Sequence, residues 1–359
     1  MVPKSLFAIG MGLSVVLLTA ASPKSAPPPQ RESGPIQVNV VLVQLNIAVT
    51  DRKGGYISGL RPENFAIYED NIPEKIAWFE EGDKSGRRII DVARAGGSDG
   101  GVPQASRAAK SPDPSGLAPD ELPGANVFIL FDTSNYMYPG FVYAQDAIAG
   151  FVRSMTGPDQ IAFYSYSRDL SRGTVLTDNR MRILRAVRSS VAGDDAALYN
   201  CLLMTVQDAA PLRGRKAIVV FSNGPDNASS VPPEDVEELA QSTGTIIYII
   251  STQQAQSELV SAAVFERMSK ATGGKAYFAR NWEDEGRAFA SIQDDLSHLY
   301  TVSYYPRSNA NHGWRKITVK LVNSDLQKYR VRTRDGYRLL EQSGASGHGS
   351  APSDSSQKP

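Results

Sequence analysis

The chain has little of the side-chain chemistry that enzymes and metalloproteins use. Among its 359 residues there is one cysteine, Cys201, and the three histidines, His298, His312 and His348, are scattered without metal-ligand spacing. A single cysteine cannot form an internal disulfide, so packing alone must hold the folded part together. Cys201 falls at helical spacing with apolar neighbours, which predicts a small buried side chain rather than a nucleophile.

The chain also lacks an excess of charge of either sign. Lysine and arginine together number 38, aspartate and glutamate 38, and the formal net charge is zero. This balance argues against a general attraction to nucleic acid or anionic membranes. A phosphate-binding loop, a dinucleotide fingerprint and a nucleophile elbow are also absent from the sequence of the folded region. We therefore expect no nucleic-acid partner, no small-molecule cofactor and no enzymatic activity.

The N-terminus has the pattern of a secretory signal peptide. Lys4 precedes an apolar run over residues 6–21, and Ser22 and Pro23 follow it. We expect residues 1–21 to be a signal peptide, cleaved near Ala21, and the mature protein to be secreted or periplasmic. The alternative is an uncleaved membrane anchor, for which the run is short.

Composition divides the rest of the chain into modules. Apolar residues alternate from 41 to 49, which indicates a strand, whereas residues 95–124 are dense in glycine, serine, proline and alanine. We expect a Pro-rich linker at 22–36, an N-terminal β module at 37–82, a flexible linker at 83–124, an α/β domain at 125–299, a C-terminal β segment at 300–340 and a disordered tail at 341–359. Each β segment is too small to bury a good core alone, so we predict that both pack together as one β-sandwich.

The predicted α/β domain alternates short apolar runs with amphipathic stretches. The expected strands are residues 127–131, 160–166, 217–222, 245–251 and 275–279. Residues 144–155 and 289–299 place apolar side chains at helical spacing. A helix after nearly every strand predicts a doubly wound, mostly parallel sheet with helices on both faces.

Polar residues follow the first of these strands. The run 127–131 ends in Asp132, with Ser134 two residues further on and Tyr136 after that. In open α/β sheets the carboxyl edge is where ligands bind. We expect two more loops at this edge. One has Asp194, Asp195 and Ala196 before an Ala-Leu-Tyr sequence, and the other has Ser222, Asn223, Gly224 and Asp226 at the end of the strand at 217–222.

These motifs resemble the von Willebrand factor type A (VWA) domain over residues 126–299. The metal-ion-dependent adhesion site of that family opens with Asp-x-Ser-x-Ser, and later loops supply a threonine before Ala-Leu-Tyr and an Asp-Gly pair. Asp132 and Ser134 match this pattern. Tyr136, Ala196 and Asn223 stand where the family has the second serine, the threonine and the aspartate.

The flanks resemble those of a bacterial, acidobacterial-type group of VWFA-related domain proteins. The matching sequences are Gly-Leu-x-x-Glu-Asn-Phe at 59–65 and Tyr-Glu-Asp at 68–70, then Tyr-Tyr-Pro at 304–306 and Arg-x-Gly-Tyr at 334–337. With the flanks included, the resemblance runs from about residue 36 to residue 340. It implies a VWA/Rossmann-like fold and export, and no particular activity.

The three altered positions remove oxygen ligands that Mg²⁺ requires in near-ideal octahedral geometry. The nearby carboxylates of Asp194, Asp195 and Asp226 are the candidate substitutes, because Ca²⁺ accepts looser geometry. We expect no cofactor, or at most weak binding of Mg²⁺ or Ca²⁺, at a degenerate adhesion site.

These observations favour a secreted or envelope-associated, non-enzymatic binding or scaffold protein. Its partner would be a protein of unknown identity, with Tyr136 as an aromatic contact at the sheet edge. Contact with a membrane would come only from an uncleaved signal. Two alternatives stay open: metal-dependent adhesion through the substitute carboxylates, and a cryptic hydrolase that uses Asp132 with Asp194 or Asp195. The sequence does not distinguish these from a structural envelope component.

Overall fold

The computed structural model describes residues 42–82, 87–88, 124–155, 159–252 and 259–339. The predicted signal peptide, Pro-rich linker and C-terminal tail lie outside the described residues, as does most of the predicted linker at 83–124. Within the described ranges, no helix has both the length and the apolar character that a membrane crossing requires.

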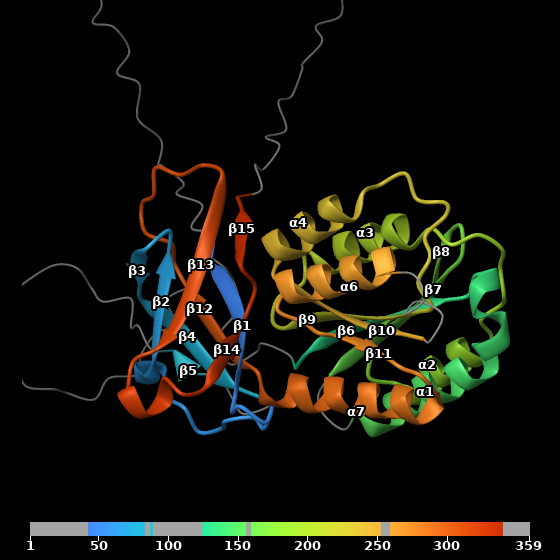
Figure 1. The fold of residues 1–359 in the computed structure, drawn as a ribbon, viewed down its shortest axis with the longest axis horizontal. Helices are drawn as coiled ribbons and strands as arrows, with labels where there is room; N and C mark the ends of the chain where they lie inside the picture. Colours follow the sequence, from blue (N-terminus) through green and yellow to red (C-terminus); the bar gives the residue numbers. More distant parts are fainter. Residues whose placement is uncertain (1–41, 83–86, 89–123, 156–158, 253–258, 340–359) are drawn as a thin grey trace, which may run out of the picture. The chain divides into compact units, whose positions relative to one another are not determined.

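Six strands form one mostly parallel sheet (Figure 1). They are β6 (Asn126–Asp132), β7 (Gln160–Tyr166), β8 (Leu170–Thr177), β9 (Lys216–Ser222), β10 (Thr245–Ser251) and β11 (Ala276–Phe278). Their order is β11-β10-β9-β6-β7-β8, and every neighbouring pair is parallel except β7 with β8. The predicted doubly wound sheet is confirmed. The edge strand β8 was not predicted.

Helices cover both faces of this sheet. They are α1 (Phe141–Ser154), α2 (Arg180–Arg188), α3 (Leu198–Ala209), α4 (Pro233–Thr243), α6 (Leu259–Ala271) and α7 (Trp282–His298), with a short 3₁₀ helix η3 (Asn135–Gly140) before α1. Ile129 of β6 packs in the cluster with α1, α2 and α7, and the next residue, Leu130, packs with α3, α4 and α6. Because neighbouring side chains of a strand face opposite sides, a strand covered on both sides reads as one continuous apolar run.

Strands from both ends of the chain build two antiparallel sheets around one core. The first sheet has the order β14 (Arg330–Arg332), β1 (Val43–Thr50), β12 (Tyr300–Tyr304), β4 (Ile76–Glu81) and β5 (Arg87–Arg88). The second has the order β15 (Gly336–Arg338), β13 (Trp314–Leu321), β2 (Phe65–Glu69) and β3 (Ile72–Glu74). Two further 3₁₀ turns are η1 (Pro62–Asn64) and η4 (Ser324–Leu326). A single apolar cluster draws on both sheets, so the flanks form one β-sandwich, as predicted.

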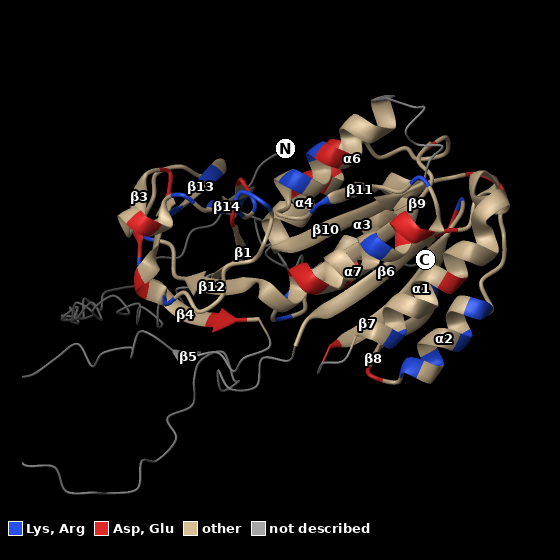
Figure 2. Ribbon diagram, turned by 60° about the horizontal axis from the view of Figure 1, so that its bottom comes forward, with Lys and Arg blue, Asp and Glu red and all other residues tan. Residues whose placement is uncertain are grey.

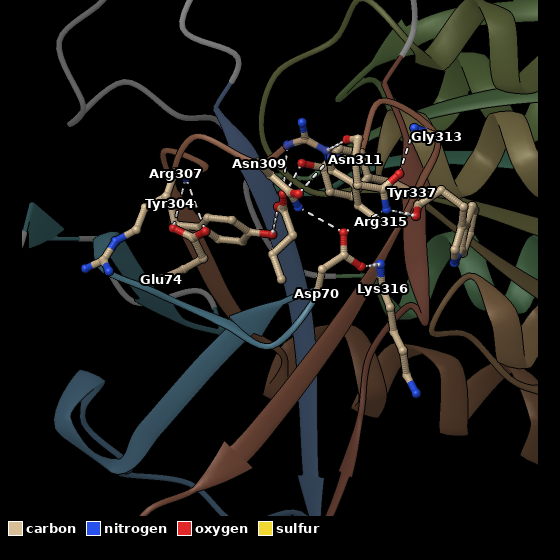
Figure 3. A network of polar contacts seen from close by, with 12 residues as sticks. Asp70, Glu74, Tyr304, Arg307, Asn309, Asn311, Gly313, Arg315, Lys316 and Tyr337 are labelled. Atoms are coloured by element: carbon tan, nitrogen blue, oxygen red, sulfur yellow. Dashed lines mark hydrogen bonds and ion pairs between the residues drawn. The ribbon is translucent and has the colours of Figure 1, made fainter.

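The turn between β2 and β3 anchors the loop that joins β12 to β13. Asp70 has a φ of 49° and the next residue, Asn71, 68°, the left-handed pair that a two-residue hairpin needs. The carboxylate of Asp70 accepts hydrogen bonds from the side-chain amides of Asn309 (2.9 Å) and Asn311 (2.8 Å) and from the backbone nitrogen of Lys316 (2.9 Å) (Figure 3). These bonds use both carboxylate oxygens of Asp70, so its role is structural.

A buried carboxylate of α7 depends on groups from the β-sandwich. Asp295 is fully buried, and it accepts hydrogen bonds of 2.6 Å from the hydroxyls of Tyr56 and Tyr248 and a charged bond of 2.6 Å from Arg332 of β14. Burial opposes the charge, but Arg332 and Lys275 outweigh it, so the pKa of Asp295 lies below its usual value. The buried ion pair between Asp295 and Arg332 therefore links the α/β domain to the sandwich.

Candidate binding face at the carboxyl edge of the sheet

Three loops converge at the carboxyl edge of the parallel strands. The backbone nitrogen of Asn135, after β6, donates to the carbonyl of Asp194 at 2.9 Å. The backbone nitrogen of Gly193 donates to the carbonyl of Thr133 at 2.7 Å. The structure therefore brings the first two predicted loops together, as parallel topology requires.

Asp132, the retained carboxylate, is fully buried and already hydrogen-bonded within the protein. Its Oδ1 accepts the backbone N–H of Ser134 at 2.9 Å, and its Oδ2 accepts the hydroxyl of Ser222 at 2.7 Å. Burial raises the pKa of Asp132, although these hydrogen bonds act in the opposite direction. The hydroxyl of Ser134 is also fully buried, and within the described part of the chain its oxygen has no hydrogen-bond partner.

Side-chain amides occupy the space between the altered positions. The side-chain nitrogen of Asn223 donates to the backbone carbonyl of Tyr136, which links the third loop to the first. The side-chain carbonyl of Asn227 accepts the backbone N–H of Ala196 at 2.8 Å, and its amide nitrogen lies 3.4 Å from the hydroxyl of Tyr136. All three loops are thus held together by protein groups.

The carboxylates proposed as substitute ligands have other contacts. Asp195 forms an ion pair with Arg168 at 2.9 Å. Asp226 uses both oxygens for backbone N–H groups, with Oδ2 accepting from Tyr199 at the start of α3 and Oδ1 from Ser229, each at 2.9 Å. The side chain of Asp194 is exposed.

The groups at this edge do not fit a hard divalent cation. Asp132 and Ser134 would supply only two of the six oxygens around an octahedral Mg²⁺, and waters or a partner would have to supply the rest. The amide of Asn223 turns an N–H donor, which repels a cation, toward the first loop. Within the described ranges, no three His, Cys, Asp or Glu residues are grouped so that they could hold a metal ion.

Asn227 is the residue of this site that sequence reasoning missed. It binds the second loop through Ala196 and lies beside the hydroxyl of Tyr136 in the first. The VWA pattern does not mark it, because that pattern concerns ligands of a metal and Asn227 is a bridge between loops. In the sequence Asn227 opens an Asn-Ala-Ser triplet, the pattern of a glycosylation acceptor, which gives no hint of this role.

Large apolar side chains are exposed around the same edge. Helices α1, α6 and α7 follow parallel strands, so their first turns lie at the carboxyl edge. The exposed side chains of these turns and the neighbouring loops, between 49% and 80% exposed, are Tyr138, Val142, Tyr143, Val191, Val260 and Trp282. We call these six residues the apolar rim. The hydroxyl of Tyr138 donates to the carbonyl of Gly193 at 2.8 Å and so fixes one side of the rim to the second loop.

A hydroxyl and a carboxylate are paired at this edge, and both are buried away from solvent. Ser222 donates its proton to Asp132 at 2.7 Å, while the hydroxyl of Tyr166 donates to Ser222 at 3.1 Å, and all three side chains are buried. Burial raises the pKa of Cys201 to about 12, so its thiol is protonated at neutral pH.

Comparison with known proteins gives similar folds at low sequence identity. No family model matches the sequence, and no curated protein matches it. A von Willebrand factor type A structure from Catenulispora acidiphila is 13% identical, with a TM-score of 0.41, over 61% of this chain and 67% of that one. BatB from Bacteroides thetaiotaomicron is 15% identical, with a TM-score of 0.41, over 48% of this chain and 98% of that one.

A third similar structure is proximal thread matrix protein 1 from the mussel byssus, with zinc in its adhesion-site motif. It is 15% identical, with a TM-score of 0.40, over 52% of this chain and 49% of that one. At these values the three structures identify no ligand or partner for this chain. With its parallel core, its antiparallel edge strand and its three converging loops, the segment from β6 to α7 has the VWA-like fold that the sequence motifs imply.

Proposed function

We propose that this chain is a secreted or envelope-associated binding protein that recognises a protein partner through the apolar rim, without an obligatory metal ion and without catalysis. The observation that carries the proposal is the bridge from Asn227 to Ala196, together with the bond from Asn223 to Tyr136. These amides hold the three loops in place, which is the task of the ion in a metal-dependent adhesion site. A preorganised surface loses less conformational entropy when it binds.

The exposed side chains support a protein as the partner. Tyrosine and tryptophan are enriched at the centres of protein interfaces, because they bury a large area at low entropic cost. Tyr138, Tyr143 and Trp282 are all at least 49% exposed on the rim. Tyr136, the predicted contact, is only partly exposed, so we assign it to the support of the loops rather than to the main contact.

The proposal is tested by capture and cross-linking from an envelope extract, followed by quantitative mass spectrometry. The test variant carries Tyr138→Ser, Val142→Ser and Tyr143→Ser. The control, Tyr305→Ser, Val175→Ser and Val322→Ser, removes three exposed side chains away from the rim, one tyrosine and two valines. We expect at least one captured protein to be retained by the unmodified chain and by the control, in the presence of EDTA, and lost from the rim variant. Capture that EDTA abolishes, or that both variants retain equally, would contradict the proposal.

An activity assay distinguishes the proposed binding function from the alternative, a hydrolase. Purified protein is assayed against ester, phosphoester and peptide substrates, with and without divalent ions. The proposal expects no turnover above the buffer rate. Turnover that is lost in Asp132→Asn, with the fold retained by circular dichroism, would favour the enzyme.

A further inference from the structure

Helix α2 has a local excess of positive charge, although the chain as a whole has none. Its nine residues include four arginines and no acidic residue, whereas the whole chain has a formal net charge of zero. Figure 2 shows these basic positions along α2. The four are Arg180, Arg182, Arg185 and Arg188.

Two of these arginines have partners within the fold. The guanidinium of Arg180 donates to the backbone carbonyl of Asp159 at 3.2 Å, and Arg188 forms an ion pair with Asp146 of α1. Arg182 and Arg185 are exposed, and within the described ranges neither is paired with a carboxylate. Two guanidinium groups therefore face solvent without a counter-charge.

Helix stability favours Arg185, which lies in the last turn of α2, but it does not explain Arg182. The N-cap Asn179 accepts the backbone N–H of Arg182 at 3.1 Å, which places Arg182 in the first turn. The N-terminus of a helix carries positive partial charge, and a cation there is unfavourable by about 0.3–1 kcal/mol. Beside it, Met181 leaves 64% of its surface exposed. This face of α2 is therefore both basic and partly apolar, and Arg182 is there at a cost to the isolated helix.

The C-terminal end of α2 leads toward the apolar rim. The side-chain amide of Gln145 donates to the carbonyl of Val187 at 2.9 Å and so holds the end of α2 against α1. The chain then passes through Val191 of the rim to Gly193, whose carbonyl accepts the hydroxyl of Tyr138. A partner seated on the rim can therefore extend along α2.

We propose that the exposed face of α2 docks an acidic segment of the protein partner, with aspartate or glutamate side chains on Arg182 and Arg185 and an apolar side chain on Met181. This inference rests on the proposed function and names the chemistry of its partner. The guanidinium group is a planar fork that binds a carboxylate through two hydrogen bonds. Residues three apart on a helix have Cβ atoms about 5–6 Å apart, so two carboxylates of one short segment can reach both groups.

The structure favours a protein segment over a membrane or a nucleic acid. Ile183 and Val187, the apolar face of α2, are fully buried in the core, so the helix cannot insert them into a bilayer. The helix has no aromatic side chain on which a base could stack. Two free guanidinium groups neutralise too few phosphates for useful affinity toward a polyanion at physiological salt.

The test uses a fluorescein-labelled peptide of four Glu-Asp-Leu repeats, capped at both ends, and a neutral control of four Gln-Asn-Leu repeats. Binding to the full chain is measured by fluorescence anisotropy at low and high salt. The test variant is Arg182→Gln with Arg185→Gln. The control, Lys328→Gln with Arg330→Gln, removes the same charge from exposed positions of the β-sandwich. Circular dichroism and thermal unfolding confirm that each variant is folded.

We expect the acidic peptide to bind about tenfold more tightly than the neutral one at low salt, with the difference falling as salt increases. The test variant should lose about tenfold in affinity and the control less than about twofold. Equal affinity for both peptides, or an unchanged test variant, overturns the proposal. Arginine-dependent binding to phosphatidylglycerol vesicles without peptide binding also overturns it. In either case, loss of partner capture in the rim variant would still support the proposed function.

Discussion

The side-chain carbonyl of Asn227 accepts a hydrogen bond of 2.8 Å from the backbone nitrogen of Ala196. Ala196 stands where a VWA metal site has a threonine ligand, and its side chain is fully buried. An amide from the third loop therefore makes a direct hydrogen bond to the second loop at this position. The loops keep their mutual position through protein hydrogen bonds.

Removing this bridge should destabilise the fold. In Asn227→Ala the backbone N–H of Ala196 loses its acceptor, and leaving a buried donor unsatisfied costs about 1–3 kcal/mol. Urea unfolding, with Asn323→Ala as the exposed control, measures the difference. If Asn227→Ala loses no more unfolding free energy than the control, the bridge does not contribute to stability.

Removing the cation that compensates Asp295 should cost more. In Arg332→Met the buried carboxylate keeps only Lys275, at 3.6 Å, as a cationic partner, and breaking a buried ion pair on one side costs about 3–5 kcal/mol. The low pKa of Asp295 stabilises the unmodified protein at any pH above the usual pKa of an aspartate. This stabilisation is lost as the pH falls through the pKa that Asp295 has in the folded protein. In the variant the pKa of Asp295 should instead be raised, because burial is then no longer offset by Arg332.

The deficit of Arg332→Met should therefore be largest near neutral pH and should become smaller as the pH falls and Asp295 of the variant takes up a proton. Unfolding free energies across this range measure it, with Arg330→Met, exposed on the same strand, as the control. A deficit that does not change with pH would mean that Arg332 acts through packing alone.

Glu285 should make the protein less stable as the pH rises. Burial raises the pKa of Glu285 to about 7, and its Oε2 has no hydrogen-bond partner within the described residues. A group with a raised pKa contributes stability at any pH below its usual pKa. This stability is lost as the pH rises through the pKa that the group has in the folded protein. Glu285→Gln should gain about 1–3 kcal/mol relative to the unmodified protein between pH about 5 and about 8. Glu283→Gln, exposed in the same helical turn, should show no such change in thermal unfolding.

The turn that carries Asp70 should control the loop between β12 and β13. Asp70→Ala removes the acceptor of Asn309, Asn311 and the backbone of Lys316, which should cost about 1–3 kcal/mol. Hydrogen exchange of residues 305–313 should accelerate in this variant and stay unchanged in Asp325→Ala. Unchanged exchange in Asp70→Ala would show that the loop is fixed by other contacts.

The sequence predicts four of the parallel strands, β6, β7, β9 and β10, because each is buried on both faces and appears as an apolar run. It also predicts the short edge strand β11, which is only half-buried. Strand β8 has no such run, since it lies at the sheet edge with Arg172 and Gly173 in its centre. Its register against β7 shifts twice, between Ile161 and Phe163 and again at Tyr164. Bulges of this kind break the period-two pattern on which strand prediction depends.

The predicted positions of the site follow from the order of the loops, but their hydrogen-bond partners do not. The pairing of Asp195 with Arg168, and the contacts of Asp226 with the start of α3, join segments far apart in the chain. A motif gives the residue types at a ligand position and does not give their competing partners. The bridge from Asn227 to Ala196 depends on the same three-dimensional closure.

Calorimetric titration of Mg²⁺ into the unmodified full chain tests the central claim most directly. Asp132 and Ser134 alone, without the oxygens lost at Tyr136, Ala196 and Asn223, should give no heat of binding below millimolar concentrations. The variant Tyr136→Ser, Ala196→Thr and Asn223→Asp serves as the positive control and should bind measurably tighter. Micromolar affinity in the unmodified chain would contradict the account and would point to Asp194, Asp195 or Asp226 as ligands.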